Sequence, residues 1–140
     1  MALADYTSEL LATAQALAAP GKGILAVDES TKTIGKRLGS IGVENTEANR
    51  QAYRGMLFTT AGLGEFISGA ILYEETLFQS HADGESMVDK LGKLGIITGI
   101  KVDKGLRPLD GANAFETLCT GLDGCLLYTS DAADETGRGG

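Results

Sequence analysis

The sequence predicts an α/β fold built from parallel strand–helix units. Three short apolar runs have the composition of strands that are buried on both faces. Amphipathic segments with helical spacing separate these runs, and such alternation is typical of a parallel sheet with crossover helices. A parallel sheet of three strands leaves two edges unpaired, so the predicted fold is incomplete without further strands or a partner.

The amino-terminal segment predicts a helix, a strand and a second helix. Apolar residues recur at helical spacing over residues 7–18, namely Leu10, Leu11, Ala14, Leu17 and Ala18. Residues 23–28 form a short apolar run that ends in a carboxylate, as expected of a buried strand. Residues 31–39 predict a short helix, for which Ser30 or Thr31 can serve as the N-cap.

The middle of the chain repeats this alternation. Asn45-Thr46 can cap a helix over residues 46–58, whose predicted apolar face consists of Ala48, Ala52, Tyr53, Met56 and Leu57. Residues 67–73 predict a second buried strand, residues 85–94 a helix, and residues 96–102 a third strand.

Composition excludes several classes of protein. The chain has 140 residues, of which 43% are hydrophobic, which is too many for a disordered chain. Its net charge is -7 and it has no basic stripe, so nucleic-acid binding is not expected. No apolar run is long enough to span a membrane. The two cysteines are too few for a disulfide framework, and they have no metal-ligand partner at usable spacing.

The first residues carry acids and lack the basic and apolar regions of a targeting segment. A cytoplasmic protein is therefore expected, with an organelle as the alternative. The only histidine, His81, lies in a polar stretch and is expected to be a solvated loop residue.

Polar clusters follow the first and third predicted strands. Asp28-Glu29-Ser30-Thr31 comes after the first, and Lys101-Val102-Asp103-Lys104 ends the third. Because the carboxyl ends of parallel strands share one edge, Asp28 and Lys101 could approach each other. A lysine beside a carboxylate can bind a phosphate, or form an imine if its pKa falls. Ser30, Thr33 and Arg37, with a helix amino terminus, could hold a phosphate dianion.

The same residues could instead have purely structural roles. The segment 28–31 could simply cap a helix, and Lys101 and Lys104 could be solvated strand ends. Lys36-Arg37 could be an exposed helix face. Glu74-Glu75 is more often the start of a helix than a catalytic pair. Taken alone, these residues indicate part of a phosphate-binding enzyme of the βα type.

The same residues resemble class I fructose-bisphosphate aldolases, especially those of plant and algal plastid type, which makes the plastid stroma the alternative compartment. The resemblance covers residues 1–124 in family order, through Pro-Gly-Lys-Gly-Ile-Leu-Ala-Val-Asp-Glu-Ser at 20–30, Gly-Lys-Arg-Leu at 35–38, Glu-Asn-Thr-Glu-Ala-Asn-Arg-Gln-Ala-Tyr-Arg at 44–54, Ser-Gly-Ala-Ile-Leu-Tyr-Glu-Glu-Thr-Leu at 68–77, Gly-Ile-Lys-Val-Asp-Lys-Gly at 99–105 and Gly-Leu-Asp-Gly at 121–124. It implies that the chain supplies the first three βα units of a (β/α)8 TIM barrel. It also implies metal-free, cofactor-free cleavage of fructose 1,6-bisphosphate through a lysine imine, by a homotetramer.

By position, the resemblance assigns catalytic roles to Asp28 and Lys101. It places Ser30, Thr33 and Arg37 near one substrate phosphate. The Schiff-base lysine of the family stands in a Leu-Leu-Lys-Pro context that this chain lacks, so the fragment itself is expected to be inactive. Lys32 stands where the family commonly has a small residue.

The last residues do not continue the pattern. Residues 125–135 read Cys-Leu-Leu-Tyr-Thr-Ser-Asp-Ala-Ala-Asp-Glu, which looks like one reading frame of a transposase-type sequencing adapter. We therefore predict one incomplete domain over residues 1–124 and a non-native tail over residues 125–140, with a flexible acidic tail as the alternative. The competing functions are a non-catalytic phosphosugar-binding or partner-binding domain, and a short enzyme of another βα family that uses Lys101.

Overall fold

The computed structural model describes residues 6–110 and 116–121. The chain divides into two compact units, Met1–Lys101 and Val102–Gly140. The predicted tail over residues 125–140 lies outside the described residues.

The first unit contains the predicted parallel sheet. Its strands are β1 (Gly23–Val27), β2 (Ile67–Leu72) and β3 (Ile97–Ile100), in the order β1-β2-β3. Both pairings are parallel, and Ala26, Ile71 and Gly99 lie side by side across the sheet. The three predicted strands are therefore confirmed.

Six helices accompany the sheet in the described part of this unit. They are α1 (Thr7–Leu17), α2 (Thr31–Ser40), α3 (Glu47–Phe58), α4 (Leu63–Phe66), α5 (Glu74–Leu77) and α6 (Met87–Lys93). The expected caps are in place, because the hydroxyls of Ser30 and Thr46 accept hydrogen bonds from backbone amides in the first turns of α2 and α3. Glu74 starts α5, which confirms the structural reading of Glu74-Glu75. The sequence did not predict the four-residue helix α4.

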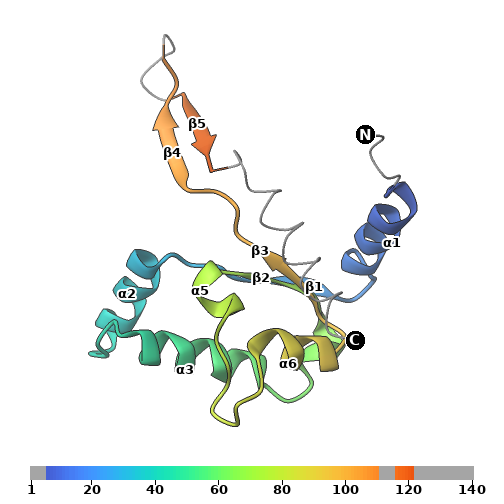
Figure 1. The fold of residues 1–140 in the computed structure, drawn as a ribbon, viewed down its shortest axis with the longest axis horizontal. Coiled ribbons are helices and arrows are strands. Elements are labelled where there is room, and N and C mark those ends of the chain that lie inside the picture. The colour runs from blue at the N-terminus through green and yellow to red at the C-terminus, as the bar shows by residue number, and fades with distance from the viewer. Residues whose placement is uncertain (1–5, 111–115, 122–140) are drawn as a thin grey trace, which may run out of the picture. The chain divides into compact units, whose positions relative to one another are not determined.

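Helices cover the two faces of the sheet unequally (Figure 1). The ribbons of α3 and α6 lie on one side, where residues from the strands and these helices form the core: Val27, Phe58, Ala70, Leu72, Met87, Leu91 and Ile96. On the other side, α1 meets β2 near its start. The Ser68 hydroxyl donates to the Leu17 carbonyl at 2.6 Å, and the Leu17 side chain covers Gly69 so closely that a Cβ there would overlap it.

Burial of the strands departs from the prediction. Only β2 is largely buried, whereas Ile24 in β1 remains 52% exposed and Thr98 in β3 is exposed. The reason is that β1 and β3 are edge strands, with no further strand beside them among the described residues. Leu10 and Leu11 of α1 are exposed too, although the helix itself forms as predicted.

The predicted apolar face of α3 is only partly confirmed, in that Leu57 packs against the core and Tyr53 is half-buried. Ala48, Ala52 and Met56 are exposed, and the buried side of the helix instead carries Arg50, Arg54, Gly55 and Phe58. Arginines can occupy this face because their aliphatic stems pack while their guanidinium groups find carboxylate and carbonyl partners.

The second unit contains a hairpin that the sequence did not predict. Strands β4 (Gly105–Pro108) and β5 (Thr117–Thr120) pair antiparallel, and Lys104 N donates to Thr120 O at 2.8 Å. Both strands are short and mostly exposed, so they lack the apolar periodicity that identified the other strands.

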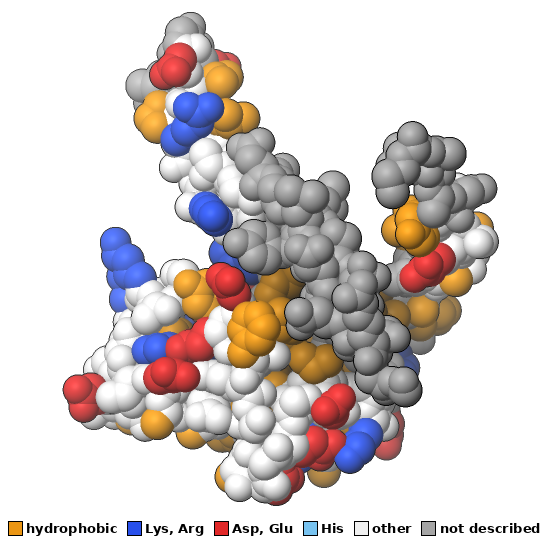
Figure 2. All heavy atoms as spheres, in the orientation of Figure 1, with side chains coloured by type: hydrophobic (Ala, Val, Ile, Leu, Met, Phe, Trp, Pro, Cys, Tyr) orange, Lys and Arg blue, Asp and Glu red, His pale blue; other side chains and the backbone are white. Residues whose placement is uncertain are grey.

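No helix among the described residues is long and apolar enough to cross a membrane. Acidic and basic side chains both occur on the described surface that is visible in Figure 2.

Two glycine substitutions test the packing of the helices. A Cβ at Gly64 would overlap the backbone carbonyl of Leu94, whereas a Cβ at Gly92 in α6 meets open space. In the full-length protein, Gly64→Ala should lower the free energy of unfolding by about 1–3 kcal/mol, because backbone cannot easily move aside. Gly92→Ala is the matched control and should be neutral or stabilise by up to about 1 kcal/mol. Equal urea midpoints for the two variants would contradict this packing.

Candidate functional site

Asp28 and Lys101 meet at the carboxyl edge of the sheet. Asp28 directly follows β1, and Lys101 continues the ladder beyond β3, since its backbone N–H donates to Leu72 O at 2.8 Å. Alternation from Ala26 and Gly99 places both residues on the face opposite the core. Lys101 Nζ lies 3.9 Å from Asp28 Oδ2, and each side chain remains about one quarter exposed, at 25% and 27%. The predicted approach of these two groups is confirmed.

Ser30 and Thr33 lie together at the amino terminus of α2. The Ser30 hydroxyl accepts from Thr33 N at 3.3 Å, and the two hydroxyl oxygens are 3.1 Å apart. Ser30 therefore caps the helix, as the structural reading proposed, while remaining beside the sheet edge that carries Asp28. This places two hydroxyls and a helix amino terminus where an anion is favoured.

Arg37 lies one turn further along α2 and already has an acidic partner. Its guanidinium donates to the Glu29 carboxylate, while the Arg37 side chain stays 57% exposed and that of Glu29 only 11%. Lys32 is exposed on the same helix. The arrangement leaves Arg37 accessible to solvent, but an anion would have to compete with Glu29 for it.

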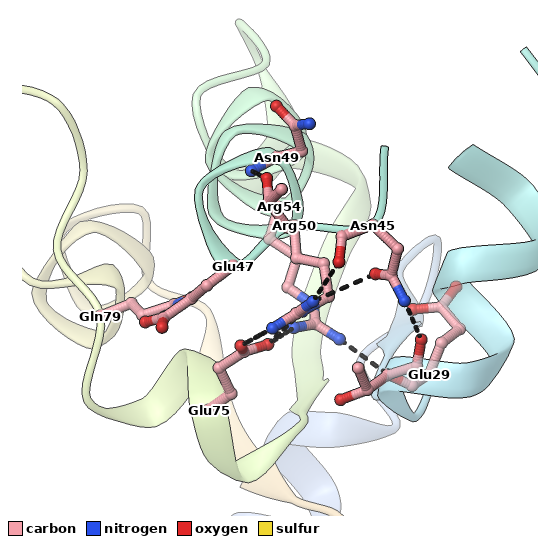
Figure 3. Close-up of polar contacts among 10 residues, drawn as sticks. Glu29, Asn45, Glu47, Asn49, Arg50, Arg54, Glu75 and Gln79 are labelled. Carbon is pink, nitrogen blue, oxygen red and sulfur yellow. Dashed lines mark hydrogen bonds and ion pairs between the residues drawn. The ribbon is translucent and has the colours of Figure 1, made fainter. Parts of the chain in front are cut away.

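The sequence reasoning missed a buried ion network behind this edge (Figure 3). Arg50 and Arg54, one turn apart on α3, both donate to Glu75 at the start of α5. The bonds are 2.9 Å from Arg50 Nε and 3.2 Å from Arg54 Nη1 to Glu75 Oε2. The sequence contained one signal for this network. Two arginines stand at positions i and i+4 of a predicted helix, and an acidic residue follows the next predicted strand.

The same network reaches the backbone on both sides of Ser30. Arg54 Nη2 donates to the Glu29 carbonyl at 2.7 Å. Arg50 Nη1 donates to Asn45 Oδ1 at 3.1 Å, and Asn45 Nδ2 donates to the Thr31 carbonyl at 3.0 Å. The loop between β1 and α2 is thus bonded directly to α3 through Arg54, while Asn45 links Arg50 to the first residue of α2, as the dashed lines of Figure 3 show.

Burial and pairing shift the pKa values of this network in opposite directions. Hydrogen bonding from Arg50 lowers the pKa of the Glu75 carboxyl below its ordinary value, against the effect of burial. The hydrogen bond to Glu75 raises the pKa of Arg50. Burial lowers the pKa of the Arg54 guanidinium, although Glu75 partly offsets this effect. Arginine nevertheless remains charged in proteins, so all three groups are ionised at neutral pH.

His81 lies away from this network. It is in a loop, as predicted, but its side chain is only 28% exposed and packs against Gly55 of α3. His81 Nδ1 is 3.5 Å from Asp83 Oδ1. Within the described ranges, no group of three or more His, Cys, Asp or Glu side chains could hold a metal ion.

Known proteins similar to this chain are aldolases. The family model described as "Glycolytic: Fructose-bisphosphate aldolase class-I" matches residues 9–135. The chain is 62% identical over 120 residues to a chloroplastic fructose-bisphosphate aldolase of Spinacia oleracea, covering 86% of the chain and 30% of that relative. It is 63% identical over 128 residues to the chloroplastic enzyme of Oryza sativa subsp. japonica, covering 91% of the chain and 32% of that relative.

A solved structure of fructose-bisphosphate aldolase from Plasmodium falciparum, in complex with TRAP and a small-molecule inhibitor, has the same fold. It superposes with a TM-score of 0.87 at 52% identity, over 94% of this chain and 38% of that one. The chain therefore spans about a third of the length of the relatives it matches.

The expectation of a cytoplasmic protein is wrong. Relatives at this level of identity, from Spinacia oleracea, Oryza sativa and Chlamydomonas reinhardtii, are chloroplastic enzymes. The expectation failed because it rested on the first residues of the chain, and the fold itself carries no signal for a compartment.

Glu75 should make stability depend on pH. Because its pKa in the folded protein is lowered from 4.5, its contribution is present above that value and is lost as the pH falls through the folded pKa. Glu75→Gln in the full-length protein should lower the free energy of unfolding by about 3 kcal/mol at neutral pH, since it leaves buried Arg54 without a countercharge. The difference from wild type should shrink at an acidic pH below the folded pKa of Glu75, where the wild-type carboxyl also becomes neutral. Urea unfolding at both pH values measures this; a constant difference would show that the carboxylate charge is unimportant.

Proposed function

Because the chain belongs to the class-I fructose-bisphosphate aldolase family, we propose that it forms the amino-terminal part of an enzyme that cleaves fructose 1,6-bisphosphate. The products are dihydroxyacetone phosphate and glyceraldehyde 3-phosphate, and the reaction is reversible. The observation that carries this proposal is the pairing of Asp28 with Lys101, 3.9 Å apart at the carboxyl edge of a parallel sheet. In barrels of this kind that edge holds the active site.

The reaction needs a group that this chain lacks. A lysine on a later strand of the full-length protein forms an imine with the keto carbon and releases water. The protonated imine accepts the electron pair of the breaking carbon–carbon bond and becomes an enamine, while the departing hydroxyl loses its proton to form the aldehyde. Protonation of the enamine and addition of water then release dihydroxyacetone phosphate and the free lysine.

In this mechanism, Asp28 and Lys101 act on the reacting carbons. Asp28 orients substrate hydroxyls and assists proton transfers, for which a partly exposed carboxylate at the sheet edge is suited. Lys101 is a fixed positive charge that offsets substrate phosphate and the carboxylate of Asp28. Their mutual contact keeps each charged group partnered before substrate arrives.

One substrate phosphate would bind at the amino terminus of α2. Ser30 and Thr33 offer hydroxyls beside the positive end of a ten-residue helix. Arg37 would contribute a charged hydrogen bond by exchanging the Glu29 carboxylate for phosphate, which its 57% exposure allows. The charged contact is expected to contribute more to binding than either hydroxyl.

Two further proposals follow from the family resemblance, and a third from the sequence itself. We propose that the full-length protein works in a plastid, in line with the chloroplastic relatives. We also propose that it assembles as a homotetramer, as the family resemblance implies. The third proposal is that residues 125–140 are foreign to the native protein, from the adapter-like string that follows Gly124. Sedimentation of the full-length protein measures the assembly.

The chain of 140 residues should not turn over fructose 1,6-bisphosphate, because it lacks the imine-forming lysine. Incubation with dihydroxyacetone phosphate and borohydride should leave its mass unchanged, while the full-length protein gains one reduced adduct. A stable adduct on the 140-residue chain would show that one of its own lysines forms the imine.

Substitutions at the carboxyl edge should abolish most activity of the full-length enzyme. Asp28→Asn removes a proton-transfer group and should lower kcat about 10²–10⁴-fold. Lys101→Met removes the positive charge beside Asp28 and should lower kcat/KM about 10²-fold or more. His81→Ala is the control, and its kcat should stay within about twofold of wild type. A large loss for His81→Ala with an active Asp28→Asn variant would place the site elsewhere.

A further inference from the structure

Arg54 is the most completely buried charged residue described in the chain. Its side chain is 0% exposed and projects from α3, on the side of the sheet that carries the core. One terminal nitrogen binds Glu75 Oε2 and the other binds the Glu29 carbonyl. Its guanidinium carbon also lies 5.5 Å from the centroid of the Tyr73 ring. A single planar group thus touches the ends of two strands at once.

Stability alone does not account for this arrangement. A buried ion pair is often no more stabilising than well-packed apolar side chains of the same volume. Arg54 Nε is buried and has no hydrogen-bond partner among the described residues, which adds a desolvation cost. A buried arginine with an unpaired Nε is easier to explain if the directions of its hydrogen bonds serve the candidate site.

The two contacts of Arg54 bracket the candidate site. The Glu29 carbonyl belongs to the residue after Asp28, so the bond at 2.7 Å restrains the backbone from which the Asp28 side chain projects. Glu75 and Tyr73 follow β2, which lies between β1 and β3 in the sheet. Lys101 is joined to this same strand end through its bond to the Leu72 carbonyl. Arg54 therefore ties the backbone beside Asp28 to the strand that also aligns Lys101.

We propose that Arg54 is a positioning residue that holds Asp28 at working distance from Lys101. It acts through the Glu29 carbonyl and the Glu75 carboxylate and does not touch substrate. This inference rests on the proposed aldolase activity and deepens it. Only a forked guanidinium can reach both partners, since a lysine ammonium in this place has one nitrogen and a shorter reach.

The test is Arg54→Lys in the full-length enzyme, with Arg50→Lys as the matched control. Both variants keep a positive charge near Glu75, but Arg50 has no bond to the Glu29 carbonyl. Arg54→Lys should lower kcat about 10- to 100-fold, because a displacement of about 1 Å at a reacting group has this effect. Its KM should change less than about threefold, since the phosphate-binding groups on α2 are untouched. Arg50→Lys should lose a similar amount of Tm yet keep kcat within about threefold of wild type.

Crystal structures of the two variants supply a readout that does not depend on turnover. In Arg54→Lys, the separation of Asp28 Oδ2 and Lys101 Nζ should exceed that of the wild-type crystal structure by about 1 Å or more, and in Arg50→Lys it should not. Equal losses of kcat in both variants, or an unchanged separation in Arg54→Lys, would overturn the positioning role. A wild-type enzyme that fails to cleave fructose 1,6-bisphosphate would refute the proposed function, and the crystal structures would then still decide whether Arg54 positions Asp28.

Discussion

The need to partner a buried guanidinium organises the part of the molecule that carries the candidate site. Arg54 is enclosed between α3 and the sheet, where an unpaired charge would be strongly unfavourable. Its carboxylate partner, Glu75, can only be supplied where β2 ends and α5 begins, and its carbonyl partner comes from the loop after β1. The same contacts that satisfy Arg54 therefore determine where two strand ends lie relative to α3. Asp28 follows the first of these strand ends, and Lys101 is joined to the second by its backbone bond to the Leu72 carbonyl.

This arrangement explains why charged residues gather at the carboxyl edge of a sheet whose core face is mainly apolar. The core beneath the sheet consists of aliphatic and aromatic side chains from β1, β2, α3 and α6. Such packing holds the layers together, but it does not fix the exact position of one strand end relative to its neighbour. Hydrogen bonds with fixed directions at the carboxyl edge remove that freedom. The apolar core supplies cohesion, and the arginine network supplies alignment.

The sequence predicted the elements whose patterns are local. The three strands of the parallel sheet, the caps at Ser30 and Thr46, and the approach of Asp28 to Lys101 follow from periodicity and from the shared edge of parallel strands. Prediction from the sequence failed where contacts between residues distant in the chain determine which face of an element is buried. The buried face of α3 could not be found by counting apolar residues, because Glu75, 21 residues from Arg54, makes a charged face the buried one. Short exposed strands such as β4 and β5 have no apolar pattern to find. The pairing of Arg37 with Glu29 likewise depends on how α2 turns away from β1.

We propose that Asp28 and Lys101 form half of a site that later strands complete. The decisive measurement is the sequence of the transcript and of the genomic DNA across the codons for Gly124. We expect the reading frame to continue into further strand–helix units and to reach a strand that carries a lysine in a Leu-Leu-Lys-Pro context. A stop codon directly after Gly140 in genomic DNA would contradict it, because the carboxylate and lysine would then have no imine-forming partner in the same chain.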